Sequence, residues 1–218
     1  MRFYEAGKIP PQGRLYFIYG DGGTGKTTLF KSFPGKKKLL ISFDLSISVL
    51  SGDESVDIVS IEPQDLPIIQ DQSLKCIYFA LQNQKYDAVG IDNVTALQNY
   101  VLQTINKSKD NRNNYQELQH WFRELGTNLK LSNKNIYVTA HQVDKGPEFM
   151  EGRFAADMNE KTFNAFTSMF DVVGRIYIKD GERLIDLDPE KGNHAKNRLD
   201  DRKLIKANEL FTEFTEEK

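Results

Sequence analysis

Short apolar runs alternate with amphipathic segments along most of the chain. The apolar runs are four to six residues long and predict strands at 15–19, 38–43, 88–91 and 135–140, and alternation of apolar and polar residues predicts a further strand at 56–61. Between and after them, helical periodicity predicts helices at 27–33, 63–83, 94–105, 115–131 and 159–170. The fourth helix is the clearest, because its apolar residues recur at spacings of four, three and four: Leu118, Phe122, Leu125 and Leu129.

Towards the C-terminus the pattern changes to that of a β-hairpin. Residues 171–178 and 182–188 flank Asp180-Gly181, a dipeptide that favours a tight hairpin turn. The segments 107–114 and 143 to about 160 lack periodicity and are expected to be loops. The alternation as a whole predicts an α/β fold, with a mostly parallel central sheet flanked by helices and a C-terminal β-hairpin. We expect one domain over 1–218, with an N-terminal extension at 1–14 and a charged tail at 200–218.

A glycine-rich stretch follows the first predicted strand and opens the first helix. It matches the phosphate-binding pattern G-x-x-x-x-G-K-[ST], in which backbone N–H groups surround the phosphates. Lys26 is expected to reach the β- and γ-phosphates, and the Thr27 hydroxyl to bind Mg²⁺. A glycine turn before an ordinary basic helix is the alternative, which the complete pattern and its flanks disfavour. The predicted nucleotide-binding residues are Gly20, Asp21, Gly22, Gly23, Thr24, Gly25, Lys26, Thr27 and Thr28.

Other polar residues also fall at strand ends, where ligands bind in open parallel sheets. Asp92 is expected to hold Mg²⁺ with Thr27; its alternative role is to cap the next helix, which Asn93 would do equally well. Asp44 is the candidate base for an attacking water, or else a solvated strand end. His141 and Gln142 are candidate sensors of the γ-phosphate, or else residues that cap a turn.

Charge and composition add limits rather than a function. The net charge of −2 gives no overall field for nucleic acid, so any DNA site must be local. The single Cys76 excludes an internal disulfide and suits a reducing cytoplasm. No apolar run approaches the roughly 20 residues of a membrane span, and the first residues lack a signal-peptide core. We therefore expect a soluble protein located in the cytoplasm.

Basic and aromatic residues in the two predicted loops are candidates for binding DNA. Cations can contact phosphates, and exposed rings can stack on bases. The alternatives are solvated loops, and phenylalanines that bury against a neighbouring subunit. The candidate DNA-binding residues are Lys107, Lys109, Arg112, Lys145, Phe149, Arg153 and Phe154.

Lys196 and Arg198 form a second basic pair, after the predicted hairpin. In an oligomeric ATPase, such a pair can place two cations on the γ-phosphate of a neighbouring subunit. A solvated basic strand end is the alternative.

Taken in order, these motifs resemble the RecA-like ATPase core. More narrowly, they resemble phage-encoded nucleotide-binding proteins of the Sak-type single-strand annealing and recombination class. The pair Asp92-Asn93 lacks the Asp-Glu typical of AAA+ ATPases. The resemblance covers about residues 12–200 and rests on 20–28, 91–93, 139–142 and 195–198.

This resemblance implies a protein that uses ATP and Mg²⁺ and oligomerises, as a ring or filament, on single-stranded DNA. ATP would lie between subunits, with Lys26, Thr27 and Asp92 from one subunit and Lys196 and Arg198 from the next. The resemblance also implies a single-strand-binding protein as a partner. The implied location is the cytoplasm of a bacterial host. RecA-like enzymes commonly carry Asp-x-Glu after the second strand, but Ser46 stands at the Glu position. Either Asp44 replaces that base, or hydrolysis is slow and ATP binding is the switch.

Two other functions fit the same motifs. One is an ATPase that serves as a helicase loader or a packaging-type motor. The other is a nucleotide-gated scaffold that binds ATP and a protein but no DNA. Binding of single-stranded oligonucleotides separates the first interpretation from these two.

Overall fold

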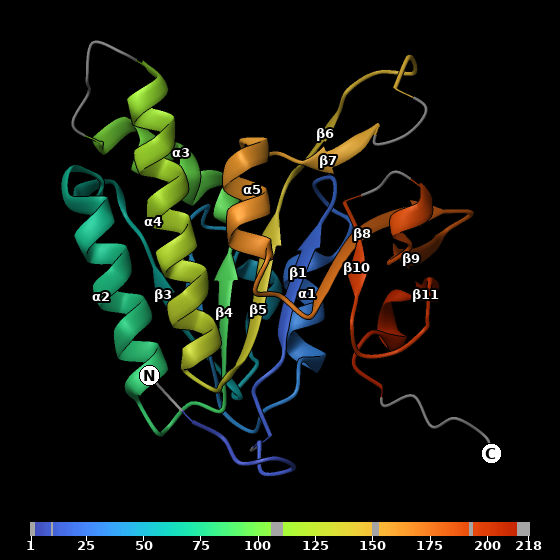
Figure 1. Ribbon diagram of the computed structural model, residues 1–218, viewed down its shortest axis with the longest axis horizontal. Helices are drawn as coiled ribbons and strands as arrows, with labels where there is room; N and C mark the ends of the chain where they lie inside the picture. Colours follow the sequence, from blue (N-terminus) through green and yellow to red (C-terminus); the bar gives the residue numbers. More distant parts are fainter. Residues whose placement is uncertain (1–2, 10, 106–110, 150–152, 192–193, 213–218) are drawn as a thin grey trace.

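A mostly parallel β-sheet forms the centre of the molecule (Figure 1). The computed structural model describes residues 3–9, 11–105, 111–149, 153–191 and 194–212. Within these residues the sheet has nine strands in the order β11-β9-β8-β1-β5-β4-β2-β3, with β10 beside β8, and β6 and β7 form a separate pair. The strands are β1 (Leu15–Tyr19), β2 (Lys38–Ser42), β3 (Val56–Ser60), β4 (Ala88–Asp92), β5 (Asn135–Ala140), β6 (Gln142–Asp144), β7 (Phe154–Ala156), β8 (Val172–Lys179), β9 (Glu182–Asp186), β10 (Lys196–Asn197) and β11 (Leu204–Lys206).

Helices cover both faces of the sheet. Four of them, α2 to α5, pack on one face, and α1 packs on the other face together with the 3₁₀ turns that carry Phe30, Leu50 and Ala207 (Figure 1). The helices are α1 (Lys26–Leu29), α2 (Ile69–Gln82), α3 (Val94–Thr104), α4 (Asn111–Leu131) and α5 (Glu160–Thr167). The 3₁₀ turns are η1 (Phe30–Ser32), η2 (Ser48–Leu50), η3 (Pro63–Ile68), η4 (Pro189–Lys191) and η5 (Ala207–Glu209).

The central strand β1 is buried on both faces, which explains why it is a continuous apolar run. Leu15, Phe17 and Tyr19 point towards the layer of α2 to α5, whereas Tyr16 and Ile18 point towards α1. Phe17 makes edge-to-face contacts with three phenylalanines in or just after α5, at centroid distances of 5.4 to 6.2 Å: Phe163, Phe166 and Phe170. This packing fixes the strand from which the glycine-rich loop begins.

The register of the parallel strands brings their C-terminal ends to one edge of the sheet. Tyr19 pairs with Ala140, and Ser42 pairs with Asp92, so β1, β5, β4 and β2 end side by side. Strand β5 lies between β1 and β4, and the strand of the glycine-rich loop is therefore not a neighbour of the strand that ends at Asp92.

The expected α/β core, with its mostly parallel sheet and C-terminal hairpin, is confirmed. All five predicted strands are present within a residue or two of their expected bounds. The hairpin of β8 and β9 turns at Asp180 and Gly181, whose φ angles of 53° and 80° belong to a two-residue turn.

Two segments expected to be loops are partly regular. Helix α4 begins at Asn111, so 111–114 is helical and Arg112 lies in the first turn of a helix. The apolar face continues backwards through the buried side chain of Asn114, four residues before Leu118. Residues 142–144 and 154–156 form the antiparallel pair β6–β7, whose three-residue strands are too short to show an alternating pattern. The strand β11, also missed, has a single buried residue, Ile205.

Within the described part of the chain, no helix combines the length and the apolar character needed to cross a bilayer.

Candidate functional site

The glycine-rich loop leaves the end of β1 and wraps back into α1. Gly20 passes so close to β8 that an added Cβ would lie 2.3 Å from the carbonyl oxygen of Ile176. Gly23 and Gly25 have φ angles of 77° and 94°, which favour glycine over residues with a side chain. Thr24 closes the turn by donating its hydroxyl to the carbonyl of Asp21 at 2.8 Å. The geometry therefore requires glycine at three positions of the motif.

The ammonium group of Lys26 lies inside this loop. It donates to the carbonyl oxygens of Gly20 and Asp21 at 2.9 and 2.8 Å, and the residue is only 7% exposed. Burial lowers the pKa of Lys26, and the nearby carboxylates of Asp92, Asp21 and Asp44 act in the opposite direction. Phosphate oxygens entering the loop would offer this cation stronger acceptors than the two carbonyls.

Thr27 and Asp92 meet at the floor of the site. The Thr27 hydroxyl donates to Asp92 Oδ2 at 2.7 Å, and the Thr139 hydroxyl donates to Oδ1 of the same carboxylate. Asp92 is 2% exposed, and burial raises its pKa, while the two hydroxyl bonds lower it. β4, β5 and α1 are thereby tied together at one buried charge.

This pair fits Mg²⁺ by its donor chemistry. Mg²⁺ prefers oxygen ligands and is usually held by one or two protein groups, together with water and phosphate oxygens. The hydroxyl of Thr27 and the carboxylate of Asp92 supply two such oxygens. Among the described residues no group of three or more His, Cys, Asp or Glu side chains could hold a metal ion. A bound Mg²⁺ would neutralise charge on the phosphates.

Asp44 and His141 lie on either side of Asn93, above this floor. The side-chain amide of Asn93 donates to Asp44 Oδ2, and its nitrogen lies 3.2 Å from His141 Nε2. The other oxygen of Asp44 accepts from the backbone N–H of Ser46 at 3.0 Å. The structure thus brings together the predicted residues Asp44, Asp92 and His141, and adds Asn93, which sequence analysis treated only as a helix cap.

Two cavities adjoin the glycine-rich loop and share Gly25, Thr28 and Arg183. The smaller, of about 340 Å³, is lined by the loop and by Asp44, Asp92, Asn93 and His141. The larger, of about 570 Å³, lies between α1 and the C-terminal strands and is lined among others by Leu29, Ser32, Lys206 and Ala207.

Arg183 lines both cavities and was missed by sequence analysis. Its Nε would lie 3.0 Å from a Cβ added at Gly25, so its side chain crosses directly over the loop. Arg183 lies in β9, just after the Asp180-Gly181 turn of the β8–β9 hairpin, and this position brings its side chain to the loop. No spacing in the chain links Arg183 to the loop, because only the pairing of strands across the sheet brings the two together.

Gln142 connects the loop to the β6–β7 pair. Its Nε2 donates to Asp21 Oδ2 at 2.7 Å, and its Oε1 accepts from Arg175 Nε at 2.9 Å. The guanidinium carbon of Arg175 lies 3.4 Å from the centre of the Phe154 ring, in β7. A continuous set of contacts therefore runs from the glycine-rich loop to the β6–β7 pair.

The candidate DNA-binding residues differ in their surroundings. Phe149 is 48% exposed beyond β6. Phe154, in contrast, is contacted by the guanidinium groups of Arg153 and Arg175. Arg153 also forms a two-pronged ion pair with Asp144, at 2.8 and 2.7 Å. Lys145 is exposed on the same hairpin as Phe149, and Arg112 is exposed in α4. Lys107 and Lys109 lie outside the described residues.

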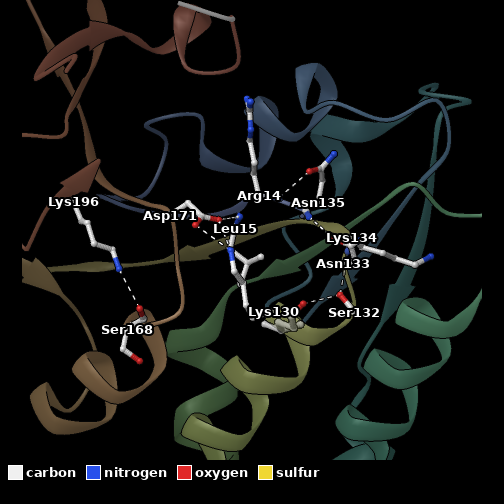
Figure 2. A network of polar contacts seen from close by, with 12 residues as sticks. Arg14, Leu15, Lys130, Ser132, Asn133, Lys134, Asn135, Ser168, Asp171 and Lys196 are labelled. Atoms are coloured by element: carbon white, nitrogen blue, oxygen red, sulfur yellow. Dashed lines mark hydrogen bonds and ion pairs between the residues drawn. The ribbon is translucent and has the colours of Figure 1, made fainter. Parts of the chain in front are cut away.

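Lys196 and Arg198 lie near the N-terminal end of β1, and Figure 2 shows Lys196 close to Ser168 and Asp171 beside Leu15. The N–H of Arg198 donates to the carbonyl of Asp171, whose carboxylate accepts from the N–H of Leu15 at the start of β1. The loop follows the other end of β1, about 13 Å away at ~3.3 Å per residue. Lys196 Nζ donates to the carbonyls of Thr167 and Ser168, and burial, with Arg198 adding to it, lowers its pKa to about 8. These contacts place both residues at the opposite end of β1 from the glycine-rich loop of their own chain.

Comparison with known proteins now identifies the family. Residues 12–199 match a family described as an AAA domain. The chain is a member of this AAA-domain family. The match spans the loop, Asp92 and β5, although the Asp-Glu pair typical of AAA+ ATPases is Asp92-Asn93 in this chain.

Two solved structures resemble this AAA-domain chain in outline. The flagellar accessory protein FlaH from Methanocaldococcus jannaschii is 14% identical, with a TM-score of 0.47 over 91% of this chain and 86% of that one. A KaiC-like protein from Pyrococcus horikoshii OT3 is 14% identical, with a TM-score of 0.49 over 81% and 78% of the two chains. A comparison with curated proteins gives no match.

The family match and the site geometry together support a P-loop ATPase core of the RecA-like type, as the motifs predicted. The narrower resemblance to phage Sak-type proteins stays a prediction, as do single-stranded DNA, oligomerisation and the roles of individual residues.

The Thr27 hydroxyl can be tested as a magnesium ligand. Thr27→Val keeps the shape of the side chain but removes the oxygen, whereas Thr27→Ser keeps the oxygen. We expect Mg²⁺ to increase ATP affinity about tenfold or more in the wild type and in Thr27→Ser, and to have little effect in Thr27→Val. Titration of a fluorescent ATP analogue with and without Mg²⁺ measures this, and an undiminished effect of Mg²⁺ in Thr27→Val would exclude the assignment.

Proposed function

We propose that this protein is a Mg²⁺-dependent ATPase that oligomerises on single-stranded DNA and acts in phage DNA recombination or annealing. The observation that carries the ATPase part is the convergence of Lys26, Thr27, Asp92 and Asp44 around one cavity at the C-terminal ends of β1, β4 and β2. The remaining parts are supported by the resemblance of the motifs and by the position of the basic and aromatic residues.

The smaller cavity suits the triphosphate, and the larger one suits the base and ribose. Lys26 and Arg183 are the cations among the described residues that line the smaller cavity, and they would face the negative phosphates. The larger cavity is apolar towards Leu29 and Ala207, as a base requires. Gly25 and Thr28 line both cavities, so the bound nucleotide would extend past these two residues.

In the proposed reaction, Asp44 accepts a proton from the attacking water. The water oxygen forms a bond to the γ-phosphorus as the bond between this phosphorus and the β,γ-bridging oxygen breaks, and ADP and phosphate leave. Asp92 is engaged by two hydroxyls, whereas Asp44 is partly exposed in the cavity. Asp44 is therefore better placed than Asp92 to contact a water. It would take the role of the Glu of RecA-like enzymes, whose position Ser46 occupies in this chain.

The β6–β7 hairpin is the proposed route to DNA. Lys145 and Phe149 are exposed on it, and Gln142 and Arg175 join it to the loop that would hold the phosphates. A shift of Asp21 on nucleotide binding would thus reach β6 through its hydrogen bond with Gln142, and β7 through the contacts of Arg175 with Gln142 and with the Phe154 ring. ATP would regulate DNA binding by this path.

The role of Asp44 predicts a loss of turnover without a loss of binding. Asp44→Asn should lower kcat about a hundredfold or more, because a general base typically contributes 10²–10⁴. Affinity for ATP should remain within about threefold. Asp180→Asn, which leaves a favourable Asn-Gly turn on the hairpin, is the matched control and should retain full activity. Steady-state ATPase assays decide the matter: equal kcat values for wild type and Asp44→Asn would rule out Asp44 as the base.

Single-stranded DNA binding is tested with a labelled oligonucleotide and fluorescence anisotropy. We expect binding with a non-hydrolysable ATP analogue, weaker binding at higher salt, and a loss of about tenfold in Phe149→Ala, since each stacked base contributes roughly 1–3 kcal/mol. Lys145→Ala should reduce the slope of affinity against salt, whereas Lys36→Ala, before β2, should not. If no oligonucleotide binds with any nucleotide, the protein is instead a loader or a scaffold.

Sharing of the site between subunits is tested by mixing two inactive variants. Lys26→Ala removes the loop cation and Arg198→Ala removes the proposed contribution to the neighbour, which by analogy with arginine fingers is worth about a thousandfold in kcat. Neither variant should turn over ATP alone. Their mixture should, because an intact loop of one then faces an intact Arg198 of the other. Normal hydrolysis by Arg198→Ala alone would contradict the shared site.

A further inference from the structure

Asn93 occupies the centre of the polar cluster but has no assigned role beyond capping α3. Its side chain is 1% exposed and makes three contacts with three different parts of the chain. One contact is local, to the N–H of Ala96, and two are distant, to Asp44 after β2 and to His141 after β5. A residue that served only as a helix cap would need the first contact alone.

The cap fixes which end of the amide faces the cavity. Asn93 Oδ1 accepts from the N–H of Ala96 at 2.9 Å, and only the oxygen of the amide can accept a hydrogen bond. The NH₂ group must therefore point away from the helix, towards Asp44 and His141. It has two hydrogens, one for each of these neighbours.

This orientation sets the hydrogen bonds that both neighbours receive. Asp44 Oδ2 accepts one hydrogen of the NH₂ group, and the second oxygen of Asp44 accepts from the N–H of Ser46, so the carboxyl group is held at both oxygens. His141 Nε2 lies 3.2 Å from the same NH₂ group and must offer its lone pair. The proton of the neutral ring is then on Nδ1.

We propose that Asn93 is the positioning residue of the ATPase site: it holds Asp44 as an aimed carboxylate and fixes His141 as the Nδ1–H tautomer. The proposal rests on the proposed function, because Asp44 acts on the water of that reaction. Asn93 links the base and the sensor through one amide, so a displacement of His141 by nucleotide would also move Asp44.

A serine substitution separates this role from helix capping. Serine caps helices about as well as asparagine, but its hydroxyl cannot reach both neighbours. Asn93→Ser should keep its thermal midpoint within a few degrees and its KM for ATP within about threefold, and lose about tenfold or more in kcat, a part of what the base contributes. Asn159→Ser is the matched control: Asn159 caps α5 in the same way, through the N–H of Thr162 at 3.2 Å, and its substitution should leave kcat unchanged.

The tautomer of His141 provides a measurement that needs neither nucleotide nor turnover. The chain has three histidines, so ¹⁵N NMR of the imidazole rings is simple to assign, with His141→Gln removing one set of signals. In the wild type at neutral pH we expect a protonated Nδ1 and an unprotonated Nε2 for His141. In Asn93→Ser the population of the Nε2–H tautomer of His141 should increase, whereas in Asn159→Ser the spectrum should not change.

The outcomes distinguish this inference from the proposed function. An Nε2–H tautomer in the wild type, or a kcat in Asn93→Ser equal to that of the wild type, would overturn the role of Asn93 while leaving the ATPase standing. Absence of ATP turnover in the wild type would instead refute the proposed function. If Asn93→Ser does not fold, the wild-type tautomer still decides whether the amide is arranged as proposed.

Discussion

The buried carboxylate of Asp92 is the constraint on which the rest of the site depends. Removing a charge from water costs several kcal/mol unless the protein supplies compensating hydrogen bonds. Two hydroxyls provide them: Thr27 from the first helix and Thr139 from the neighbouring strand. The loop, β4 and β5 must therefore meet at one point. Burial raises the pKa of Asp92, which favours any ligand that stabilises the charged form. A divalent cation is such a ligand.

The charged residues around this point lie at two depths. Asp92 and Lys26 lie deep, held by hydroxyls and carbonyls of the chain, in positions suited to binding. Asp44 and His141 lie nearer the open cavity and are joined by an amide, in positions suited to acting on a water or sensing a phosphate. Gln142 then extends the polar contacts to the β6–β7 hairpin. The residues proposed to bind the nucleotide, to act on water and to sense the phosphate thus lie close together at one edge of the sheet.

The parts of the fold and site that could be predicted are those set by local pattern. The apolar runs identified five strands, and the spacing of Gly20, Gly25, Lys26 and Thr27 identified the loop, because short-range backbone geometry dictates both. Asp92 followed from the rule that ligands bind at strand ends in parallel sheets. Arg183 and the central role of Asn93 could not be predicted, since each depends on contacts between residues far apart in the chain. The Asn93 contacts, for example, bridge 49 and 48 positions.

The secondary-structure predictions that were wrong also have specific physical causes. The strands of the β6–β7 pair are three residues long, shorter than any alternation can reveal. Helix α4 begins a turn early because a polar residue, Asn114, occupies a buried position on its apolar face. Polar residues in buried positions are invisible to a search for apolar periodicity.

The most direct test of the account is a crystal structure with Mg²⁺ and a non-hydrolysable ATP analogue. The triphosphate should lie in the cavity of about 340 Å³, Mg²⁺ should contact the Thr27 hydroxyl, and the base should lie in the cavity of about 570 Å³ beyond Arg183. Asp44 should face the γ-phosphate with Asn93 still between it and His141. A nucleotide bound elsewhere, or phosphates that leave Lys26 and Thr27 without contact, would contradict it.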